Sequence, residues 1–455
     1  MKKKEQSRRE FISTLTLGTI GAAGAAGMLA GCKGTGVFIR PETNPALQLS
    51  DQAPDGPVLK AGLIGCGSRG RGAAINFLDA GPNLEIVALG DVFQDQIDQT
   101  REILFQSRGM EIAEENCFLG FDCHHKVIDA GVDVVILASP PHFRPREVKA
   151  AVEAGKHIFL EKPVAVDPAG VRIISEQSEI AQQKQLCMVT GTIRRYQKDY
   201  IETHRRVAEG AIGDIVGANI LRHGNALWWV ERKPGWTDME YMIRNWGNFC
   251  WLSGDHIVDQ FIHELDVMSW YLGSHPVKAI GNGGRHQRQS GDQFDHFSIS
   301  FEYDNGLMAH GATRQINGLH TGKTERITGT EGFVDASGSI YDNKGVLVWE
   351  YPYPDFNDQD QTWRVQNPYL QEHVELVTAI RTGGYINDSD ENIKSTLISI
   401  MGRMAAYTGR EITWNEVLNS NMRLGPETYK LGPVSGIVET PPRIGIPSPP
   451  TDRYS

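Results

Sequence analysis

A glycine-rich turn between an apolar run and a helix-forming segment limits most strongly what this chain can fold into. The run at residues 58–64 leads into the string GCGSRG, residues 65–70, which fits the pattern G-x-G-x-x-G. A helix-forming segment follows, and Asp91 closes the next apolar run about 20 residues after the last glycine. This order of strand, glycine turn, helix and acid predicts the first βαβ unit of a dinucleotide-binding domain.

Each part of this turn has a physical role in holding a dinucleotide. The first glycine permits the tight turn, the second lets the backbone approach the pyrophosphate, and the third lets the helix pack closely. The acid accepts hydrogen bonds from the adenosine ribose and repels a 2′-phosphate, which favours NAD over NADP. The alternative is a domain of the same fold that binds nothing. The loop predicts these cofactor-binding residues: Gly65, Gly67, Ser68, Arg69, Gly70 and Asp91.

Strand and helix patterns alternate through the first half of the chain. Apolar runs at residues 132–137 and 157–160 flank a helical segment at 146–154, which stops at Gly155. Such alternation predicts a doubly wound parallel sheet, here within residues 58–187. Residues 33–57 are rich in Gly, Pro, Asn and Asp and predict an extended arm or linker.

In the second half, strands and helices no longer alternate regularly. This pattern predicts a mostly antiparallel sheet with helices, in a domain at residues 188–420. Strands are predicted at residues 215–221, 298–303, 307–313, 324–328 and 346–351. Helices are predicted at residues 199–209, 256–272, 369–381 and 390–408. Residues 421–455 form an extended, Pro-rich tail that is expected to lie over the surface.

The first 32 residues predict an export signal. Arg8 and Arg9 form a pair ahead of a glycine-interrupted apolar run at residues 12–30, which is typical of the twin-arginine route for folded proteins. The run ends at Cys32 in a sequence that resembles a bacterial lipobox, so we expect a periplasmic protein anchored through a lipidated Cys32. A plain signal cleaved near Ala30 is the alternative, and a membrane-spanning anchor is the least favoured.

Composition excludes several other classes. The net charge is −11, with 45 basic and 56 acidic residues interspersed, so nucleic acid is not an expected partner. The 6 cysteines are scattered without close pairs, which indicates neither a disulfide framework nor a zinc site.

Two segments predict acid–base chemistry. Glu161 and Lys162 follow the run at residues 157–160, where parallel sheets place ligands, and such a lysine can exchange a proton with a substrate hydroxyl. Asp259 and His263 are four residues apart, so they are expected on one face of a helix, where the carboxylate would orient the imidazole. A solvated lysine and a structural histidine are the alternatives. The acids nearby lack zinc-motif spacing, and no metal is predicted.

Three strings carry a family resemblance: LIGCGSRG, ASPPHFRPREVKAAVEAGKHIFLEKP and DQFIHELDVMSWYLG. Together they resemble the glucose–fructose oxidoreductase / inositol dehydrogenase / rhizopine-catabolism (Gfo/Idh/MocA) family over residues 58–410. The resemblance implies that Lys162, Asp259 and His263 are catalytic. It also implies an α/β fold with a Rossmann domain and a second α/β domain whose large open sheet often makes oligomer contacts. The further cofactor contacts that it implies are Ser139, Pro140, His142, Glu161 and Lys162.

The chain departs from this family before the second motif. It has Ser253-Gly254-Asp255 where the family usually has a run of glycines, which bears on the shape of the substrate loop. Tryptophans crowd the same region, and aromatic faces beside amide and basic groups suit sugar recognition, although such clusters are more often core. Besides Asp259 and His263, the predicted substrate contacts are Tyr196, Trp246 and Asn248.

Export and a nicotinamide cofactor together restrict the function. An exported enzyme cannot exchange free NAD, so the cofactor is expected to travel tightly bound and to be reset on the protein. We therefore expect an exported carbohydrate oxidoreductase that uses the twin-arginine machinery and forms a homo-oligomer, a dimer or a tetramer. An NAD-dependent, redox-neutral glycosidase is the first alternative, and a non-catalytic sugar-binding lipoprotein is the second.

Overall fold

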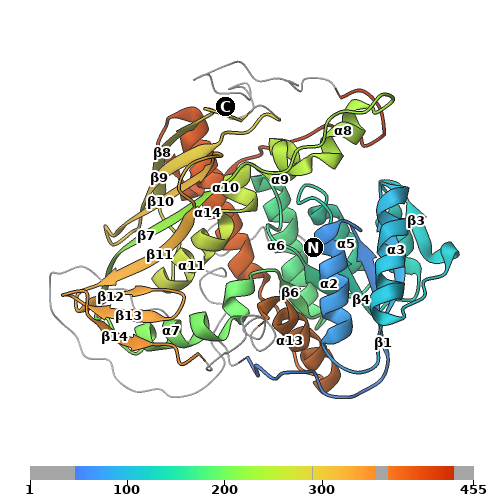
Figure 1. Ribbon diagram of the computed structural model, residues 1–455, viewed down its shortest axis with the longest axis horizontal. Coiled ribbons are helices and arrows are strands. Elements are labelled where there is room, and N and C mark those ends of the chain that lie inside the picture. Colours follow the sequence, from blue (N-terminus) through green and yellow to red (C-terminus); the bar gives the residue numbers. More distant parts are fainter. Residues whose placement is uncertain (1–46, 289–290, 354–366, 435–455) are drawn as a thin grey trace, which may run out of the picture. The chain divides into compact units, whose positions relative to one another are not determined.

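The computed structural model describes residues 47–288, 291–353 and 367–434 (Figure 1). The predicted export signal with Cys32, the start of the arm and the end of the tail lie outside the described residues. Within those ranges, no helix has both the length and the apolar character needed to cross a membrane.

Six parallel strands form the first sheet (Figure 1). They are β1 (Leu59–Ile64), β2 (Leu84–Asp91), β3 (Cys117–Leu119), β4 (Val134–Leu137), β5 (His157–Leu160) and β6 (Met188–Thr190). Their order is β3-β2-β1-β4-β5-β6, and every neighbouring pair is parallel. The order reverses between β1 and β4, and open sheets of this kind bind ligands at the carboxyl ends of the strands there. The predicted Rossmann sheet is confirmed.

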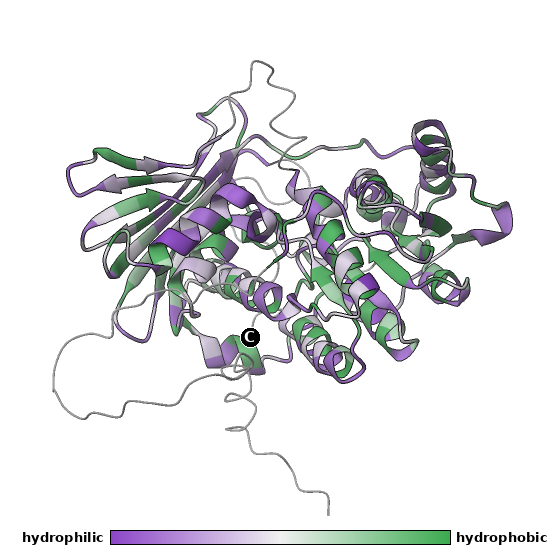
Figure 2. Cartoon of the chain, turned by 90° about the horizontal axis from the view of Figure 1, so that it is seen from below, coloured by the Kyte–Doolittle hydropathy of each residue, from purple (hydrophilic) through white to green (hydrophobic). Residues whose placement is uncertain are grey.

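Helices cover both faces of this sheet. They are α2 (Ser68–Asp79), α3 (Gln94–Arg108), α4 (Cys123–Asp129), α5 (Arg144–Glu153), α6 (Pro168–Gln183) and α13 (Pro368–Thr382). All four residues of β4 are buried, which explains why parallel strands read as continuous apolar runs rather than alternating ones. In Figure 2 these strands are hydrophobic, and the polar residues lie on the outer sides of the helices.

Nine strands form the second sheet. They are β7 (Ile215–Gly224), β8 (Lys278–Gly284), β9 (His296–Glu302), β10 (Met308–Gln315), β11 (Gly322–Gly329), β12 (Gly332–Asp335), β13 (Ser339–Asp342), β14 (Leu347–Glu350) and β15 (Ile412–Thr413). Their order is β14-β13-β12-β11-β7-β10-β9-β8-β15, and only β7 and β10 pair in parallel. The prediction of a large, mostly antiparallel sheet is confirmed.

Two helices pack against one face of the nine-stranded sheet, α11 (Ile262–Leu272) and α14 (Ser389–Thr408). The apolar core is shared, because one buried cluster contains residues of both sheets. On α14, the buried Arg403 donates hydrogen bonds to the carbonyl oxygens of Val166 and Gly254, both at 2.8 Å. The second domain is therefore tied to the loop that follows Lys162.

The helical segment predicted at residues 256–272 has the predicted bounds but is interrupted at Gln260 and Phe261. The chain forms α10 (His256–Asp259), continues through a turn at Gln260 and Phe261 whose backbones stay in the right-handed helical region, and resumes as α11. The Phe261 N–H donates to the carbonyl oxygen of His256, five residues back. This turn therefore contains one residue more than a turn of α-helix, in which the bond spans four residues. Phe261 is fully buried, and Gln260 accepts a hydrogen bond from Gln315 at 2.7 Å. Tertiary packing therefore overrides the helical pattern at this position.

The described ends of the chain lie against the Rossmann domain. In the arm, the backbone N–H of Leu49 donates to Glu375 on α13 at 2.7 Å. In the tail, the N–H of Leu424 donates to Asp167 at 2.8 Å, and Leu424 is buried. The tail up to residue 434 therefore packs into the protein rather than only covering it.

Candidate functional site

The glycine loop has the shape that a pyrophosphate requires. Gly65 has a φ of +91°, and a Cβ there would lie 2.5 Å from the backbone nitrogen of Ser139. A Cβ on Gly70 would lie 1.9 Å from the carbonyl oxygen of Gly65. A Cβ on Gly67 would meet no atom within 4 Å, so this residue faces open space at the N-terminus of α2, beside Ser68. An anionic group can approach the backbone closely only at that point.

Asp91 closes the other side of the loop at the end of β2. Its two carboxylate oxygens accept hydrogen bonds from the backbone N–H groups of Cys66 at 2.7 Å and Phe93 at 2.9 Å. Burial raises the pKa of Asp91, while these two bonds lower it. Each carboxylate oxygen has a further lone pair, which leaves capacity for the hydroxyls of a ribose. The loop and Asp91 together fit an NAD molecule.

Glu161 and Arg69 connect the glycine loop to the end of β5. The Arg69 Nε donates to Glu161 at 2.5 Å, and the guanidinium lies 4.6 Å from the ring centre of Tyr369. Another nitrogen of this guanidinium is buried without a hydrogen-bond partner among the described residues. It is a donor that a cofactor oxygen would satisfy.

Arg144 holds the loop that presents Lys162. This buried arginine, at the start of α5, donates to the carbonyl oxygens of Glu161 at 2.9 Å and of Pro163 at 2.6 Å, on either side of Lys162. It also donates to the carbonyl of Ser139 at 3.0 Å. Burial lowers the pKa of Arg144 to about 10. The Lys162–Pro163 peptide bond is cis.

The other predicted cofactor contacts follow β4. The Ser139 hydroxyl donates to the buried Glu147 at 2.5 Å, and Pro140 is half-buried. The His142 ring is 2.8 Å from the hydroxyl of Tyr429 in the tail. Burial lowers the pKa of His142 to about 3, so the ring is neutral. The tail therefore closes over the loop at this end of the Rossmann sheet.

Lys162 and Asp259 meet although they are far apart in the sequence. The Lys162 ammonium donates to the backbone carbonyl of Asp259 at 2.5 Å and lies 3.5 Å from its carboxylate. The Lys162 side chain is 17% exposed and that of Asp259 is 6% exposed, so the pair borders a surface that solvent reaches. The structure therefore brings two of the three predicted catalytic residues into direct contact.

His263 lies on the same side as this pair, on the first turn of α11. Burial lowers its pKa well below the usual value, and the positive charges of Lys162, Arg194 and Arg222 lower it further. The imidazole is therefore neutral near pH 7 and can accept a proton. The hydrogen bonds of the described residues include none between Asp259 and His263. Asp259 ends α10 and His263 belongs to α11, so the two residues do not share one helix as predicted.

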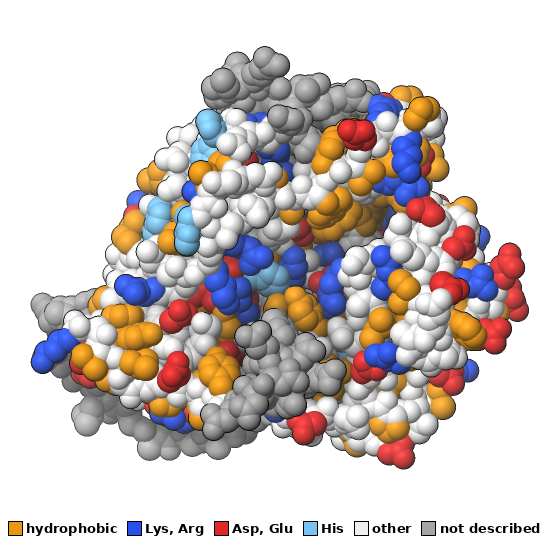
Figure 3. Space-filling view, viewed as in Figure 1, with side chains coloured by type: hydrophobic (Ala, Val, Ile, Leu, Met, Phe, Trp, Pro, Cys, Tyr) orange, Lys and Arg blue, Asp and Glu red, His pale blue; other side chains and the backbone are white. Residues whose placement is uncertain are grey.

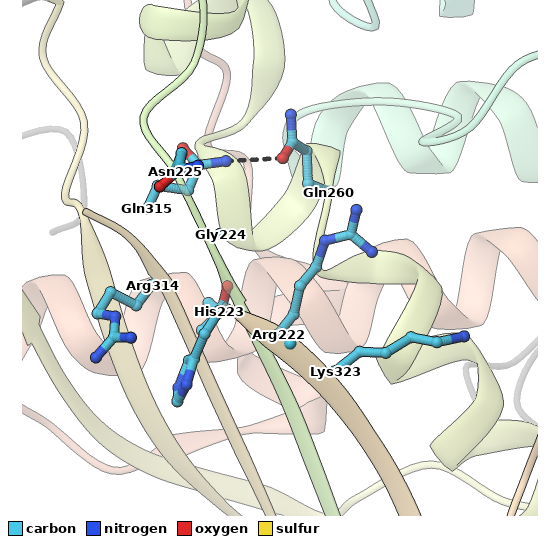
Figure 4. Close-up of a pocket in the computed structure, with 10 residues that line it drawn as sticks. Arg222, His223, Gly224, Asn225, Gln260, Arg314, Gln315 and Lys323 are labelled. Atoms are coloured by element: carbon cyan, nitrogen blue, oxygen red, sulfur yellow. Dashed lines mark hydrogen bonds between the residues drawn. The ribbon is translucent and has the colours of Figure 1, made fainter. Parts of the chain in front are cut away.

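A hollow of about 440 Å³ lies at the ends of β7, β10 and β11, beside Gln260. Figure 4 shows Arg222 and Lys323 pointing to one side of the strands, and His223 and Arg314 to the other. In Figure 3, basic side chains gather around a histidine in the hollowed centre of the visible face. Since Gln260 follows Asp259 directly, this hollow adjoins the catalytic pair.

The remaining predicted substrate contacts lie in the protein interior or at its aromatic edge. Tyr196 is 3% exposed, and its hydroxyl donates to Asp388 at 2.6 Å. Asn248 is buried, donates to the carbonyl of Trp228 at 2.9 Å and accepts from Arg288 at 3.0 Å. Trp246 is half-buried and packs edge-to-face with Trp228. Arg288 links Asn248 to Gln315 at the hollow, and the hydroxyl of Tyr196 is directed to Asp388.

Two family models match the chain. The "Oxidoreductase family, NAD-binding Rossmann fold" matches residues 59–191, and the "GFO/IDH/MocA C-terminal domain" matches residues 200–335. The chain belongs to the Gfo/Idh/MocA family. The first match contains the glycine loop, Asp91 and Lys162, and the second contains Asp259 and His263.

Relatives within the Gfo/Idh/MocA family include inositol dehydrogenases. The scyllo-inositol 2-dehydrogenase (NAD(+)) of Bacillus subtilis is 25% identical over 71% of this chain and 87% of its own length. The inositol 2-dehydrogenase of Paracoccus denitrificans is 30% identical over 47% of this chain and 54% of its own length. For relatives from Streptococcus pneumoniae and Saccharopolyspora erythraea, the chain spans only 61% and 56% of their length.

Solved structures show the same fold. The scyllo-inositol dehydrogenase of Lactobacillus casei, crystallised with NAD(H) and scyllo-inositol, matches with a TM-score of 0.59 and 19% identity. The match covers 79% of this chain and 99% of that chain.

Among the residues that the present structure describes, no three His, Cys, Asp or Glu side chains are grouped so that they could hold a metal ion.

Sequence reasoning missed residues that reach the Gfo/Idh/MocA site from a distance. Arg222 and Lys323 come from strands that pair only in the folded sheet, and Arg144 acts through backbone carbonyls. Strand alternation could have placed Arg222 on the same face as the buried Ile220. No local signal identifies its partner, because the pairing of β7 with β11 spans about a hundred residues of sequence.

Proposed function

We propose that this protein oxidises a hydroxyl group of a carbohydrate to a carbonyl, or reduces that carbonyl to the hydroxyl, with a tightly held NAD outside the cytoplasm. The observation that carries the proposal is the contact of Lys162 with Asp259, next to a glycine loop shaped for a pyrophosphate. Family membership and the inositol dehydrogenase relatives support a polyol or sugar substrate.

The residues of the site divide the chemistry between them. The chemistry that NAD would supply, when held by the glycine loop and Asp91, is acceptance of a hydride from the carbinol carbon, which would become a carbonyl. Lys162 would donate a hydrogen bond to the reacting hydroxyl oxygen, and the neutral His263 would accept its proton. Asp259 would hold the lysine ammonium in place through its carboxylate and its carbonyl. Gly67 and Asp91 would hold the pyrophosphate and the ribose.

The function is tested by following cofactor and product together. The purified protein is mixed with a panel of sugars and polyols under single-turnover conditions, and the absorbance of reduced nicotinamide is recorded. Reduction of the bound cofactor together with an oxidised sugar is the expected result. Net hydrolysis of a glycoside without a change in cofactor redox state would identify the glycosidase instead, and binding without either product would identify a sugar-binding protein.

We predict that the protein purified from its native host carries NAD through gel filtration. Asp91→Ala should lower NAD affinity by about 10- to 100-fold, since a hydrogen bond to a charged group is worth about that factor, and should weaken discrimination against NADP. Chromatography of extracted nucleotide and titration of the apoprotein measure both effects. Glu102→Ala, on the exposed side of α3, is the control. Recovery of no nicotinamide nucleotide from the native protein would contradict tight binding.

We predict export by the twin-arginine route with anchoring at Cys32. Replacing Arg8 and Arg9 together by lysine should retain the precursor in the cytoplasm, because that route reads the arginine pair. Cys32→Ala should release the mature protein from the membrane fraction, because the lipid would have no attachment site. Cell fractionation measures both. Normal export of the double lysine variant would disprove the route, and membrane retention of the Cys32 variant would disprove lipidation.

A further inference from the structure

The hollow beside the catalytic pair carries an unusual charge arrangement. Arg222 on β7 and Lys323 on β11 are direct partners across two antiparallel strands. Both point to the same side of the strands (Figure 4), where Arg222 bonds to Glu264 on α11. Among the ten residues that line the hollow, three are Arg or Lys and none is Asp or Glu. The charged residues that line the hollow are therefore all basic, and two of them, Arg222 and Lys323, point to the same side of the strands.

The balancing carboxylates lie beneath this surface. The Arg222 guanidinium bonds to Glu264 at 2.9 Å, and the Lys323 ammonium lies 3.9 Å from Glu325. The side chains of Glu264 and Glu325 are 0% and 1% exposed, whereas those of Arg222 and Lys323 are 37% and 49% exposed. The basic ends therefore reach solvent and the acidic ends do not.

The two buried carboxylates do not neutralise all of the nearby cations. Arg194 also bonds to both, at 2.8 Å to Glu264 and 2.6 Å to Glu325. The three cations thus share two carboxylates. Arg222 and Lys323 also have more N–H groups than these contacts use, since a guanidinium has five and an ammonium three. The same charges help to keep His263 neutral, as required of a proton acceptor.

The rest of the hollow suits a polyhydroxylated ring. Gln260, Thr313 and Gln315 supply neutral amide and hydroxyl groups, and a hydrogen bond of 2.7 Å joins the two glutamines (Figure 4). Arg288 donates to Gln315 from the other side and fixes its orientation. Thr313 is the direct strand partner of Arg222, and Gln315 lies two residues farther along β10, so neutral groups and cations line the hollow side by side.

We propose that the substrate is an acidic sugar whose anionic substituent is bound by Arg222 and Lys323 while its reacting hydroxyl faces Lys162. This inference rests on the proposed oxidoreductase function and names its substrate class. An anion close to a guanidinium and an ammonium in a partly desolvated hollow gains charge-assisted hydrogen bonds that a neutral sugar cannot form. Carboxylate, phosphate and sulfate share this chemistry.

The test uses sugars that differ only at the charged substituent. The series comprises D-glucose, D-glucuronate, D-glucose 6-phosphate and D-glucose 6-sulfate, with D-galactose and D-galacturonate as a second pair. Binding to the NAD-loaded protein is measured by calorimetry, and reduction of the bound cofactor by absorbance. At least one acidic sugar should bind about 10- to 100-fold more tightly than its neutral partner, and the preference should fall as salt is raised. The phosphate and sulfate arms distinguish these anions from a carboxylate.

Variants assign the preference to the two cations. Arg222→Gln and Lys323→Gln should each lower the ratio of the affinity for the acidic sugar to that for its neutral partner by about 10-fold. Lys323→Arg keeps the positive charge and should retain most of the parent ratio. Arg326→Gln is the matched control, because Arg326 lies on the same strand but is exposed and stacks on Phe333 at 4.2 Å. Glu264 keeps Arg194 as a partner in the Arg222 variant, which limits loss of folding.

The outcomes separate this inference from the proposed function. Equal binding of acidic and neutral sugars, or an unchanged ratio in both glutamine variants, overturns the acidic-sugar assignment. Cofactor reduction by neutral sugars alone overturns it too but leaves the oxidoreductase function standing. Preferential binding of an acidic sugar without reduction of NAD by any sugar supports the site and contradicts the oxidoreductase function.

Discussion

Lys162→Ala and His263→Ala should each lower the rate of cofactor reduction by about 10²- to 10⁴-fold, which is the usual contribution of a positioned acid or base. Lys162 contacts Asp259 at the border of the two domains, and His263 is held neutral by burial and by its cationic neighbours. Neither side chain touches the glycine loop in the recorded hydrogen bonds, so both variants should still hold NAD. Single-turnover absorbance of reduced nicotinamide measures the rate, and extraction measures the cofactor.

Matched variants separate chemistry from folding. Lys149→Ala removes an exposed lysine of the same domain and should leave the rate unchanged. Asp259→Asn should have a smaller effect than Lys162→Ala, because the backbone carbonyl that accepts from Lys162 remains.

Since the pKa of His263 is lowered, the parent rate should not fall between pH 8 and pH 6 through protonation of this residue. Parent-like rates in both alanine variants would place the acid–base groups elsewhere.

Gly67→Ala and Gly70→Ala should both remove bound NAD, but only the second should damage the fold. A Cβ on Gly70 would lie 1.9 Å from a backbone oxygen, and overpacking of this kind costs about 1–3 kcal/mol of unfolding free energy or more. A Cβ on Gly67 would meet no protein atom within 4 Å, so its effect falls on the pyrophosphate alone. We expect NAD affinity to fall by about 100-fold or more in Gly67→Ala, since a lost charged contact and a steric clash add.

Two measurements check this contrast. Thermal unfolding of the apoproteins should separate Gly70→Ala from the parent and leave Gly67→Ala close to it. Gly432→Ala is the control, because a Cβ there would meet no atom within 4 Å and the residue lies outside the glycine loop. If Gly67→Ala retained NAD through gel filtration as the parent does, the cofactor would not approach the backbone at this loop.

Much of the Rossmann half could be predicted because its signals are local. The run at residues 157–160 coincides with β5, and the glycine pattern at residues 65–70 coincides with the turn between β1 and α2. A strand buried on both faces is apolar throughout, and a turn with a φ of +91° favours glycine. Each of these elements can therefore be identified from the residue types within it.

The active site of the second half could be predicted only in part. The motif named Asp259 and His263, but their relation was misjudged, because a continuous helical pattern hides the break at Gln260 and Phe261. The break depends on a buried ring and on a bond to Gln315, which lies more than fifty residues away. Tyr196 was assigned to substrate from its place in the sequence, whereas Asp388, which accepts its hydroxyl proton in a hydrogen bond, directly precedes α14.

The sequence by itself determined the cofactor loop and the strands β1, β2, β4 and β5 of the first domain, because these follow from short-range periodicity and spacing. The short strands β3 and β6 were not predicted, and Lys162, Asp259 and His263 were named as catalytic through the family resemblance. Only the tertiary structure decided that Asp259 contacts Lys162 rather than His263, and that Arg222 and Lys323 line one hollow. Those contacts join residues far apart in the chain. Their energies depend on distance and burial, which no local pattern of residues contains.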